Sequence, residues 1–396
     1  PDAPVQESEN DNAQKNNDVF IKRRRGRPAG SKDKRKRKRR CTKATSLQCL
    51  IEDEVKAFMT DRADDDEEFD HVEVLLTASE VFNSPEAAQW IEADTKERVT
   101  LEAMKCWRAL DDEELKKNKE IIPAVVIYTR KRCGRFKARL VALGNRQNPD
   151  NLPEVYSPTV SHVANRALLI EAASRGLHLE GFDLTAAFIN STMDADEEVY
   201  IKLPKHWARK NKSSVVRLVK CLYGLRQAPR KWYDTYATFL RSRDWESCPE
   251  EPGLWRKGDL LLSIYVDDSL ICGPDAELVK AEMSAILQKF KGGVIEPGLE
   301  TEADGSIWEV RDILGSTHRY CKSARKMNIN MKIYIEKVLK KFGMEQCRIV
   351  HTPIVNYVND GNSTECDFPL KSLVGALQWI ATIARPDIQH AVSKVQ

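Results

Sequence analysis

A pair of adjacent carboxylates, Asp267 and Asp268, interrupts an otherwise apolar stretch of the sequence. Apolar runs at 260–266 and 269–272 flank the pair and predict two buried strands of a hairpin. Because a carboxylate buried without a partner is strongly unfavourable, the pair must either face solvent at a turn or coordinate cations in a cleft. An exposed Asp-Asp turn is common, so the spacing alone leaves both interpretations open.

Asp183 is a second case of a carboxylate at the end of an apolar segment. It follows Phe182 and precedes the small, apolar stretch 184–189. A lone Asp at a strand end more often caps a helix. If it converged with the Asp pair, the set would hold two Mg²⁺ ions, since hard oxygen ligands suit Mg²⁺ and no His cluster competes. Two such ions activate a 3′-hydroxyl and neutralise a triphosphate in an in-line displacement.

Two further segments carry charged and aromatic residues in patterns that could bind a nucleotide. Lys137 and Arg139 alternate in the strand-like run RFKARLV, which places them on one face. The ordinary interpretation is a solvated strand face, and the functional one is a clamp on triphosphate oxygens. Segment 221–233, CLYGLRQAPRKWY, combines a Gly turn with Gln227 and a basic, aromatic helix start. Its ordinary interpretation is a loop followed by an amphipathic helix with Trp232 in the core.

Helices and antiparallel hairpins must position these residues. Hydrophobic spacing and turn signals predict helices at 84–105, 163–176, 230–243, 275–290, 329–344 and 370–395, the last interrupted at Pro386. They predict hairpins at 121–144 and 260–273, a strand passing into a turn at 178–190, and strands at 197–203 and 214–220. This mixture predicts an α+β fold.

Composition and charge exclude several classes of protein. The chain has 396 residues, of which 41% are hydrophobic, so it can build a core, and its ten cysteines include no C-x-x-C pair. They are typical of reduced thiols in an intracellular protein. No apolar run approaches the length of a membrane span, so no membrane partner is expected. The chain begins at Pro1, without Met, and ends at Gln396 within a helical pattern, which predicts a fragment of a longer protein.

The charge is concentrated near the N-terminus. Residues 21–40 hold 13 Lys and Arg and one Asp, a net of +12, whereas the whole chain carries only +3. Within this tract, RGRP resembles an AT-hook core, in which Arg25 and Arg27 would enter an A·T-rich minor groove while Gly26 and Pro28 keep the backbone flat. The run KDKRKRKRR resembles a nuclear localisation sequence, so nuclear import factors are candidate partners, and a solvated charge run is the alternative.

The order of the motifs resembles the reverse transcriptase of copia-type retrotransposon polyproteins. The segments that carry the resemblance are FKARLVALG, YSPTV, FDLTAAFIN, EEVYIKLP, LVKCLYGLRQAPRKWY, YVDDSLICG, YIEKVLKKFGM, TPI and ARPDIQHAV. They run from about Ser84 to the C-terminus, and GLRQAPRKWY together with YVDD is highly specific. The resemblance implies a right-hand polymerase fold with fingers and palm over about 84–275 and a thumb and connection over about 276–396, truncated before an RNase H domain. Residues 1–83 would form a disordered tail with an acidic linker.

The resemblance also implies roles for individual residues. Asp183, Asp267 and Asp268 match the catalytic, metal-binding aspartates, and Leu184 would offer its backbone carbonyl to one of two Mg²⁺ ions, for which Mn²⁺ could substitute. The remaining matches are nucleotide-binding or primer-proximal positions: Lys137 and Arg139 on the incoming triphosphate, Phe188 as the gate that excludes a ribose 2′-hydroxyl, Gln227 near the nucleotide and Tyr265 near the primer end. The implied partners are an RNA or DNA template, a DNA or RNA primer and dNTPs.

Departures from the family pattern leave alternatives open. Ser191 stands where Gly is usual, PKHW replaces the usual segment after Leu203, and Met331 replaces a Gln. None of them removes a catalytic group. The expected function is an RNA-directed DNA polymerase in a cytoplasmic particle or the nucleus. The alternatives are an inactive, truncated remnant that only binds nucleic acid and a chromatin protein acting through residues 21–40.

Overall fold

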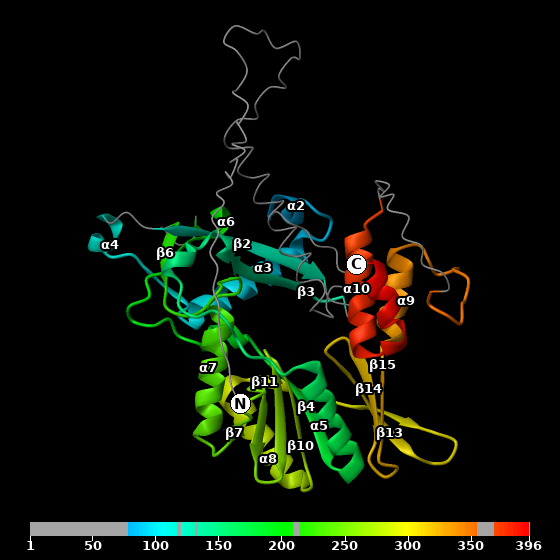
Figure 1. The fold of residues 1–396 in the computed structure, drawn as a ribbon. Helices are drawn as coiled ribbons and strands as arrows, with labels where there is room; N and C mark the ends of the chain where they lie inside the picture. The colour runs from blue at the N-terminus through cyan, green and yellow to red at the C-terminus, as the bar shows by residue number, and fades with distance from the viewer. Residues whose placement is uncertain (1–77, 117–119, 131–133, 209–213, 355–367, 396) are drawn as a thin grey trace, which may run out of the picture. The chain divides into compact units, whose positions relative to one another are not determined.

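The computed structural model describes residues 78–116, 120–130, 134–208, 214–354 and 368–395 (Figure 1). The predicted tail as far as residue 77, with its basic tract, Arg25–Pro28 and the acidic linker, lies outside these residues. Within them the fold mixes helices with three antiparallel or mixed sheets, so the predicted α+β class is confirmed. The names fingers, palm, thumb and connection remain predictions.

A five-stranded sheet forms the first part of the described chain. Its strands lie in the order β1-β6-β5-β2-β3, and every neighbouring pair is antiparallel except β2 and β5. Their bounds are Trp107–Ala109, Val215–Leu218, Tyr200–Lys202, Ile121–Arg130 and Phe136–Ala142. Helix α3 (Ala87–Ala103) packs against the edge strand β3, and three short helices complete this part: α2 (Ala78–Phe82), α4 (Asp112–Lys116) and α6 (Lys205–Ala208).

A six-stranded sheet carries the candidate catalytic carboxylates. Its strands lie in the order β11-β4-β10-β9-β8-β7, with bounds Gly292–Ile295, His178–Leu184, Asp268–Gly273, Leu260–Tyr265, Leu254–Lys257 and Glu246–Ser247. Helix α8 (Ala276–Phe290) packs against β4 and β10, while α5 (His162–Arg175) contacts β9 (Figure 1). The third helix of this part is α7 (Ala228–Arg241). Short 3₁₀ turns lie at Gly144–Arg146, Pro149–Asn151 and Ala187–Asn190.

Local signals explain where the helices of this part begin and end. Ser161 caps α5 by accepting a hydrogen bond from the Ala164 amide at 3.2 Å, and Gly176 ends the helix in the left-handed conformation at φ +64°. Asp275 caps α8 through the amides of Glu277 and Leu278. Pro229 stands in the first turn of α7, where its missing N–H has no cost.

The C-terminal part contains a four-stranded antiparallel sheet and a group of helices. The strands β12, β13, β14 and β15 follow in chain order over Gly298–Thr301, Ile307–Ile313, Ser316–Cys321 and Lys326–Asn330. Helices α9 (Lys332–Lys341) and α10 (Leu370–Ile383) share a small apolar cluster around Val338, Ala376 and Ile380. A 3₁₀ turn at Pro386–Ile388 separates α10 from α11 (Gln389–Val395), as the interruption at Pro386 predicts.

The structure departs from the predicted elements in several places. The helix predicted at 329–344 begins only at Lys332, because β15 occupies the preceding residues. Helix α2 lies before Ser84, and its Val81 is fully buried in the main core, so the folded core extends beyond the predicted boundary. The strands β1, β7, β8 and β11, the four strands β12–β15 and the short helices α4 and α6 were not predicted. The other predicted elements are confirmed within a few residues.

Candidate active site

Strand register brings two of the three predicted aspartates face to face. Asp183 at the end of β4 pairs directly with Asp268 at the start of β10. Directly opposed residues on antiparallel strands have Cα atoms about 4.5–5.5 Å apart. Asp183 is exposed and Asp268 is half-buried, while their neighbours Phe182 and Ser269 are buried. The sheet therefore presents two carboxylates side by side at its surface.

Asp267 reaches the same place through the turn that joins β9 to β10. Its backbone carbonyl accepts a hydrogen bond from the Leu184 amide at 2.9 Å, which fastens the turn to the end of β4. In the described part of the chain, no group of three or more His, Cys, Asp and Glu side chains is arranged to hold a metal ion. The opposed pair Asp183 and Asp268 nevertheless consists of hard oxygen donors, which is the chemistry that suits Mg²⁺.

Strand β11 supports Asp183 from the other edge. Gly293 pairs with Asp183, and the Thr185 amide donates a hydrogen bond to the Lys291 carbonyl at 3.1 Å. A Cβ atom at Gly292 would collide with the Asp183 carbonyl oxygen, whereas one at Gly293 would meet nothing within 4 Å. The backbone of Asp183 is therefore enclosed between β10 and β11, and the close approach of β11 requires glycine at 292.

Tyr223 is a site residue that sequence reasoning missed. The Phe188 ring meets the Tyr223 ring edge-on at 5.2 Å, and the Arg139 guanidinium lies over the same ring, 5.2 Å from its centre. The pKa of Tyr223 is raised to about 12, chiefly by burial; Arg139 opposes this rise, and the charges of Asp267 and Asp183 contribute to it. Tyr223 thus contacts two predicted residues, Phe188 and Arg139, and lies near the aspartates. In the sequence, Tyr223 precedes the turn residue Gly224 in a segment whose ordinary interpretation is a loop, and no spacing signal marks it as a site residue.

The basic residues of β3 lie beside a carboxylate from α3. Burial raises the pKa of Glu97, and the positive charges of Arg139 and Lys137 oppose that rise. Glu97 also accepts a hydrogen bond from the Leu140 amide at 3.2 Å. Arg139 therefore lies over the Tyr223 ring and close enough to Glu97 to act on its charge, as Lys137 does.

Gln227 and Tyr265 have different surroundings. Gln227 is only 1% exposed, and its Oε1 accepts a hydrogen bond from Gln147 Nε2 at 3.0 Å. Gln147 in turn accepts one from the Arg226 amide at 2.9 Å, so this pair joins the loop after β3 to the start of α7. Tyr265 pairs with Asp268 across the hairpin, and its ring lies 6.3 Å from that of His162.

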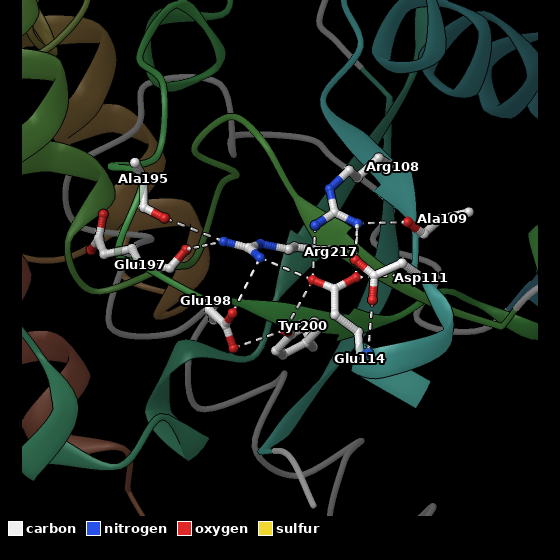
Figure 2. Close-up of polar contacts among 9 residues, drawn as sticks. All are labelled: Arg108, Ala109, Asp111, Glu114, Ala195, Glu197, Glu198, Tyr200 and Arg217. Atoms are coloured by element: carbon white, nitrogen blue, oxygen red, sulfur yellow. Dashed lines mark hydrogen bonds and ion pairs between the residues drawn. The ribbon is translucent and has the colours of Figure 1, made fainter. Parts of the chain in front are cut away.

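A second set of carboxylates lies on helices α3 and α4, beside the five-stranded sheet, and each carboxylate accepts several hydrogen bonds. Glu114 accepts hydrogen bonds from Arg108 at 2.7 and 2.8 Å, from Arg217 at 2.9 Å and from Tyr200 at 3.2 Å (Figure 2). The hydrogen bonds from Arg108 are the main reason that its pKa lies well below the usual range. Asp94 is 5% exposed and accepts from Tyr128 at 2.7 Å and from Trp207 at 2.9 Å, with His206 Nε2 at 3.0 Å.

Comparison with known proteins identifies sequences that are similar to this chain. A model of the reverse transcriptase (RNA-dependent DNA polymerase) family matches residues 105–356. The chain is 29% identical over 338 residues to the Retrovirus-related Pol polyprotein from transposon TNT 1-94 of Nicotiana tabacum, covering 80% of this chain and 24% of that protein. It is 28% identical over 274 residues to the transposon RE2 polyprotein of Arabidopsis thaliana, covering 66% and 17%.

A yeast protein gives a similar match. The Transposon Ty1-NL2 Gag-Pol polyprotein of Saccharomyces cerevisiae is 30% identical over 264 residues, which are 65% of this chain and 14% of that protein. The chain thus spans about a quarter or less of the relatives it matches. The resemblance to copia-type polyproteins is confirmed. Among the described residues, no helix has the length and apolar character to cross a membrane.

Proposed function

Because the chain belongs to the reverse transcriptase family, we propose that it is an RNA-directed DNA polymerase that adds dNTPs to a primer 3′-hydroxyl. The observation that carries this proposal is the direct pairing of Asp183 with Asp268, with the Asp267 carbonyl bonded to the Leu184 amide. Carboxylates held this way by backbone are preorganised, so they need little rearrangement when a substrate arrives.

The carboxylates would hold the catalytic cations. Asp183, Asp267 and Asp268, with the Leu184 carbonyl, would bind two Mg²⁺ ions, which when bound activate the primer 3′-hydroxyl and neutralise the triphosphate. Mn²⁺ would substitute, because it accepts the same oxygen ligands.

The surrounding residues would bind the nucleotide and primer. Arg139 and Lys137 would contact the triphosphate, with Tyr223 holding Arg139 in place through its ring. Phe188, buried against Tyr223, would limit the space beside the sugar, and Tyr265 would lie near the primer end. Gln227 would act indirectly by fixing the Tyr223 loop. In this assignment the five-stranded sheet belongs to the fingers and the six-stranded sheet, with β11 and α8, to the palm, so the thumb and connection would begin after β11 and not at about 276.

The test is primer extension on poly(rA)/oligo(dT) with dTTP and Mg²⁺. We expect incorporation by the unaltered chain, and a fall of at least about a thousandfold in Asp267→Asn and in Asp183→Asn, which corresponds to about 4 kcal/mol of transition-state stabilisation. Incorporation that survives the double variant would refute the proposal. A folded protein that binds the duplex but incorporates nothing, with Mg²⁺ or with Mn²⁺, would instead identify a remnant that only binds nucleic acid.

We also propose that residues 21–40 act as a nucleic-acid and nuclear-import segment. Its net charge of +12 is the supporting observation. Deleting 21–40 should weaken binding to A·T-rich DNA and flatten its dependence on salt, because fewer counterions are released. Nuclear accumulation of a fluorescent fusion should fall as well. Equal binding, salt slope and accumulation with and without the segment would contradict the proposal.

A further inference from the structure

The turn that presents Asp267 is strained. Tyr265 pairs with Asp268, so the hairpin β9–β10 closes with only two residues, Val266 and Asp267. Val266 has φ +57°, in the left-handed region. A β-branched residue is an outlier there, and two-residue hairpin turns usually place glycine at a central position that needs positive φ. Such a conformation persists only where neighbouring structure imposes it.

Two hydrogen bonds hold the carbonyls of this turn, and they come from different elements. The Leu184 amide of β4 donates to the Asp267 carbonyl at 2.9 Å. The indole Nε1–H of Trp232 in α7 donates to the Val266 carbonyl at 2.7 Å. The first bond aligns the turn with Asp183, and the second fixes the peptide unit that joins Val266 to Asp267.

The indole ring is itself held firmly. Trp232 is 2% exposed and packs against Tyr236, with ring centres 5.4 Å apart, and edge-on against Phe290 at 5.1 Å. Tyr236 Oη also lies 3.4 Å from Ser269 Oγ on β10. Because the ring has little freedom, its N–H has a fixed direction, and that direction is toward the strained turn.

We propose that Trp232 is a positioning residue: its indole N–H holds the Val266–Asp267 turn in its left-handed conformation and so keeps Asp267 at the site. This inference rests on the proposed polymerase function. Without the N–H, the turn would relax toward an ordinary conformation and carry the Asp267 side chain away from Asp183. Misplacing a catalytic group by about 1 Å can cost about a hundredfold in rate.

The matched pair of variants is Trp232→Phe and Trp245→Phe. Both remove an indole N–H from a buried ring, but Trp245 Nε1 donates to Glu282 at 3.1 Å, away from the turn. In single-turnover primer extension we expect Trp232→Phe to lower the maximal rate by about 10–100-fold. For Trp232→Phe, the dNTP concentration that gives half the maximal rate and the affinity for the duplex should both stay within about twofold of the values of the unaltered chain. Trp245→Phe should keep the rate. A Trp232→Phe rate within about twofold of the unaltered chain, or an equal loss in Trp245→Phe, would overturn the proposal.

A double-mutant cycle with Val266→Gly separates positioning from simple packing. Glycine adopts positive φ without strain, so the turn should need the indole N–H less. We therefore expect the rate loss caused by Trp232→Phe to be at least fivefold smaller in the Val266→Gly background than in the unaltered chain. If Trp232 only packs, the loss will be the same in both backgrounds, and the proposal fails.

A readout that needs no activity distinguishes this proposal from the polymerase assignment. Amide hydrogen exchange of peptides covering 260–273, followed by mass spectrometry, should be faster in Trp232→Phe than in Trp245→Phe or the unaltered chain. Failure of the unaltered chain to incorporate dTTP would refute the proposed function alone, and the exchange result would still decide the role of Trp232. Unchanged exchange in this hairpin would refute the positioning role whatever the activity.

Discussion

The carboxylates beside the five-stranded sheet and those at the end of the six-stranded sheet have opposite surroundings. Beside the five-stranded sheet, Asp94 of α3 and Glu114 of α4 are buried and surrounded by donors from Arg, Tyr, Trp and His side chains. In the six-stranded sheet, Asp183 is exposed, and its backbone is fixed between β10 and β11. The donors around Asp94 and Glu114 stabilise the negative charges of these residues, whereas strands β10 and β11 fix the position of Asp183. Burial and hydrogen bonding are typical of a structural carboxylate, whereas an exposed carboxylate on a fixed backbone is what the proposed cation site requires.

The largest expected effect separates activity from stability. Asp183→Asn should lower primer extension by at least about a thousandfold, because it removes a charge from the proposed cation site. Its free energy of unfolding should stay within about 0.5 kcal/mol of the unaltered chain or rise, since the side chain is exposed. Urea denaturation beside the incorporation assay measures both quantities. A large loss of stability would place Asp183 in the same class as Asp94 and break the comparison.

Asp94→Ala should give the converse result. It leaves the Tyr128 hydroxyl and the Trp207 indole N–H buried without their acceptor, so we expect a loss of about 2–3 kcal/mol in the free energy of unfolding. At a temperature where the variant remains folded, its incorporation rate should stay within a few-fold of the unaltered chain. The comparison would fail if stability were unchanged while incorporation disappeared.

Gly292→Ala and Gly293→Ala test how far the backbone beneath Asp183 matters. The first places a methyl group against the Asp183 carbonyl and should cost about 1–3 kcal/mol of stability, with a measurable fall in incorporation. The second meets open space and should change stability by no more than about 0.5 kcal/mol. Thermal unfolding of the two variants measures their stability, and primer extension measures their incorporation. Equal effects at both positions would mean that the close approach of β11 is unimportant.

The smallest expected effect is in the pH dependence of stability. Burial alone would raise the pKa of Asp94, but hydrogen bonds from His206, Tyr128 and Trp207 outweigh it and lower the pKa. A lowered folded-state pKa stabilises the fold above the unfolded pKa of about 3.9, and this contribution is lost as the pH falls through the folded value. The stability gap between the unaltered chain and Asp94→Asn should therefore be constant from about pH 5 to 7 and shrink below about pH 4. Urea titrations at pH 7, 5, 4 and 3 would contradict this if the gap were unchanged.

The sequence predicted the local parts of this architecture better than the contacts between them. The hairpin at 260–273 and the strand ending at Asp183 follow from apolar runs and turn signals, and the register of β4 and β10 then brings the aspartates together. Strand β13 is one of the strands that were missed, and a buried polar residue, Arg311, interrupts its apolar alternation, while β12 has no buried residue. Arg311 is 4% exposed and is satisfied by Glu180 at 3.0 Å, a partner 131 residues away.

The contacts of the site itself were equally hard to predict. Tyr223 and Trp232 lie in the segment that the sequence predicts as a loop followed by an amphipathic helix. Nothing in their spacing indicates which ring or carbonyl group each of them contacts. The link from Trp232 to Val266 spans 34 residues and joins a helix to a turn. Such pairings depend on tertiary packing, which hydrophobic periodicity does not encode.

The position of Glu97 has a consequence for how copies of this chain behave toward one another. Strand β3 lies at the edge of the five-stranded sheet, where unpaired amides invite a strand from another molecule to add on. Helix α3 packs against this edge, and Glu97 occupies the Leu140 amide with a carboxylate that also brings negative charge. Glu97 thus occupies one amide of this edge strand, so we expect the loss of its carboxylate to favour pairing with a strand of another molecule.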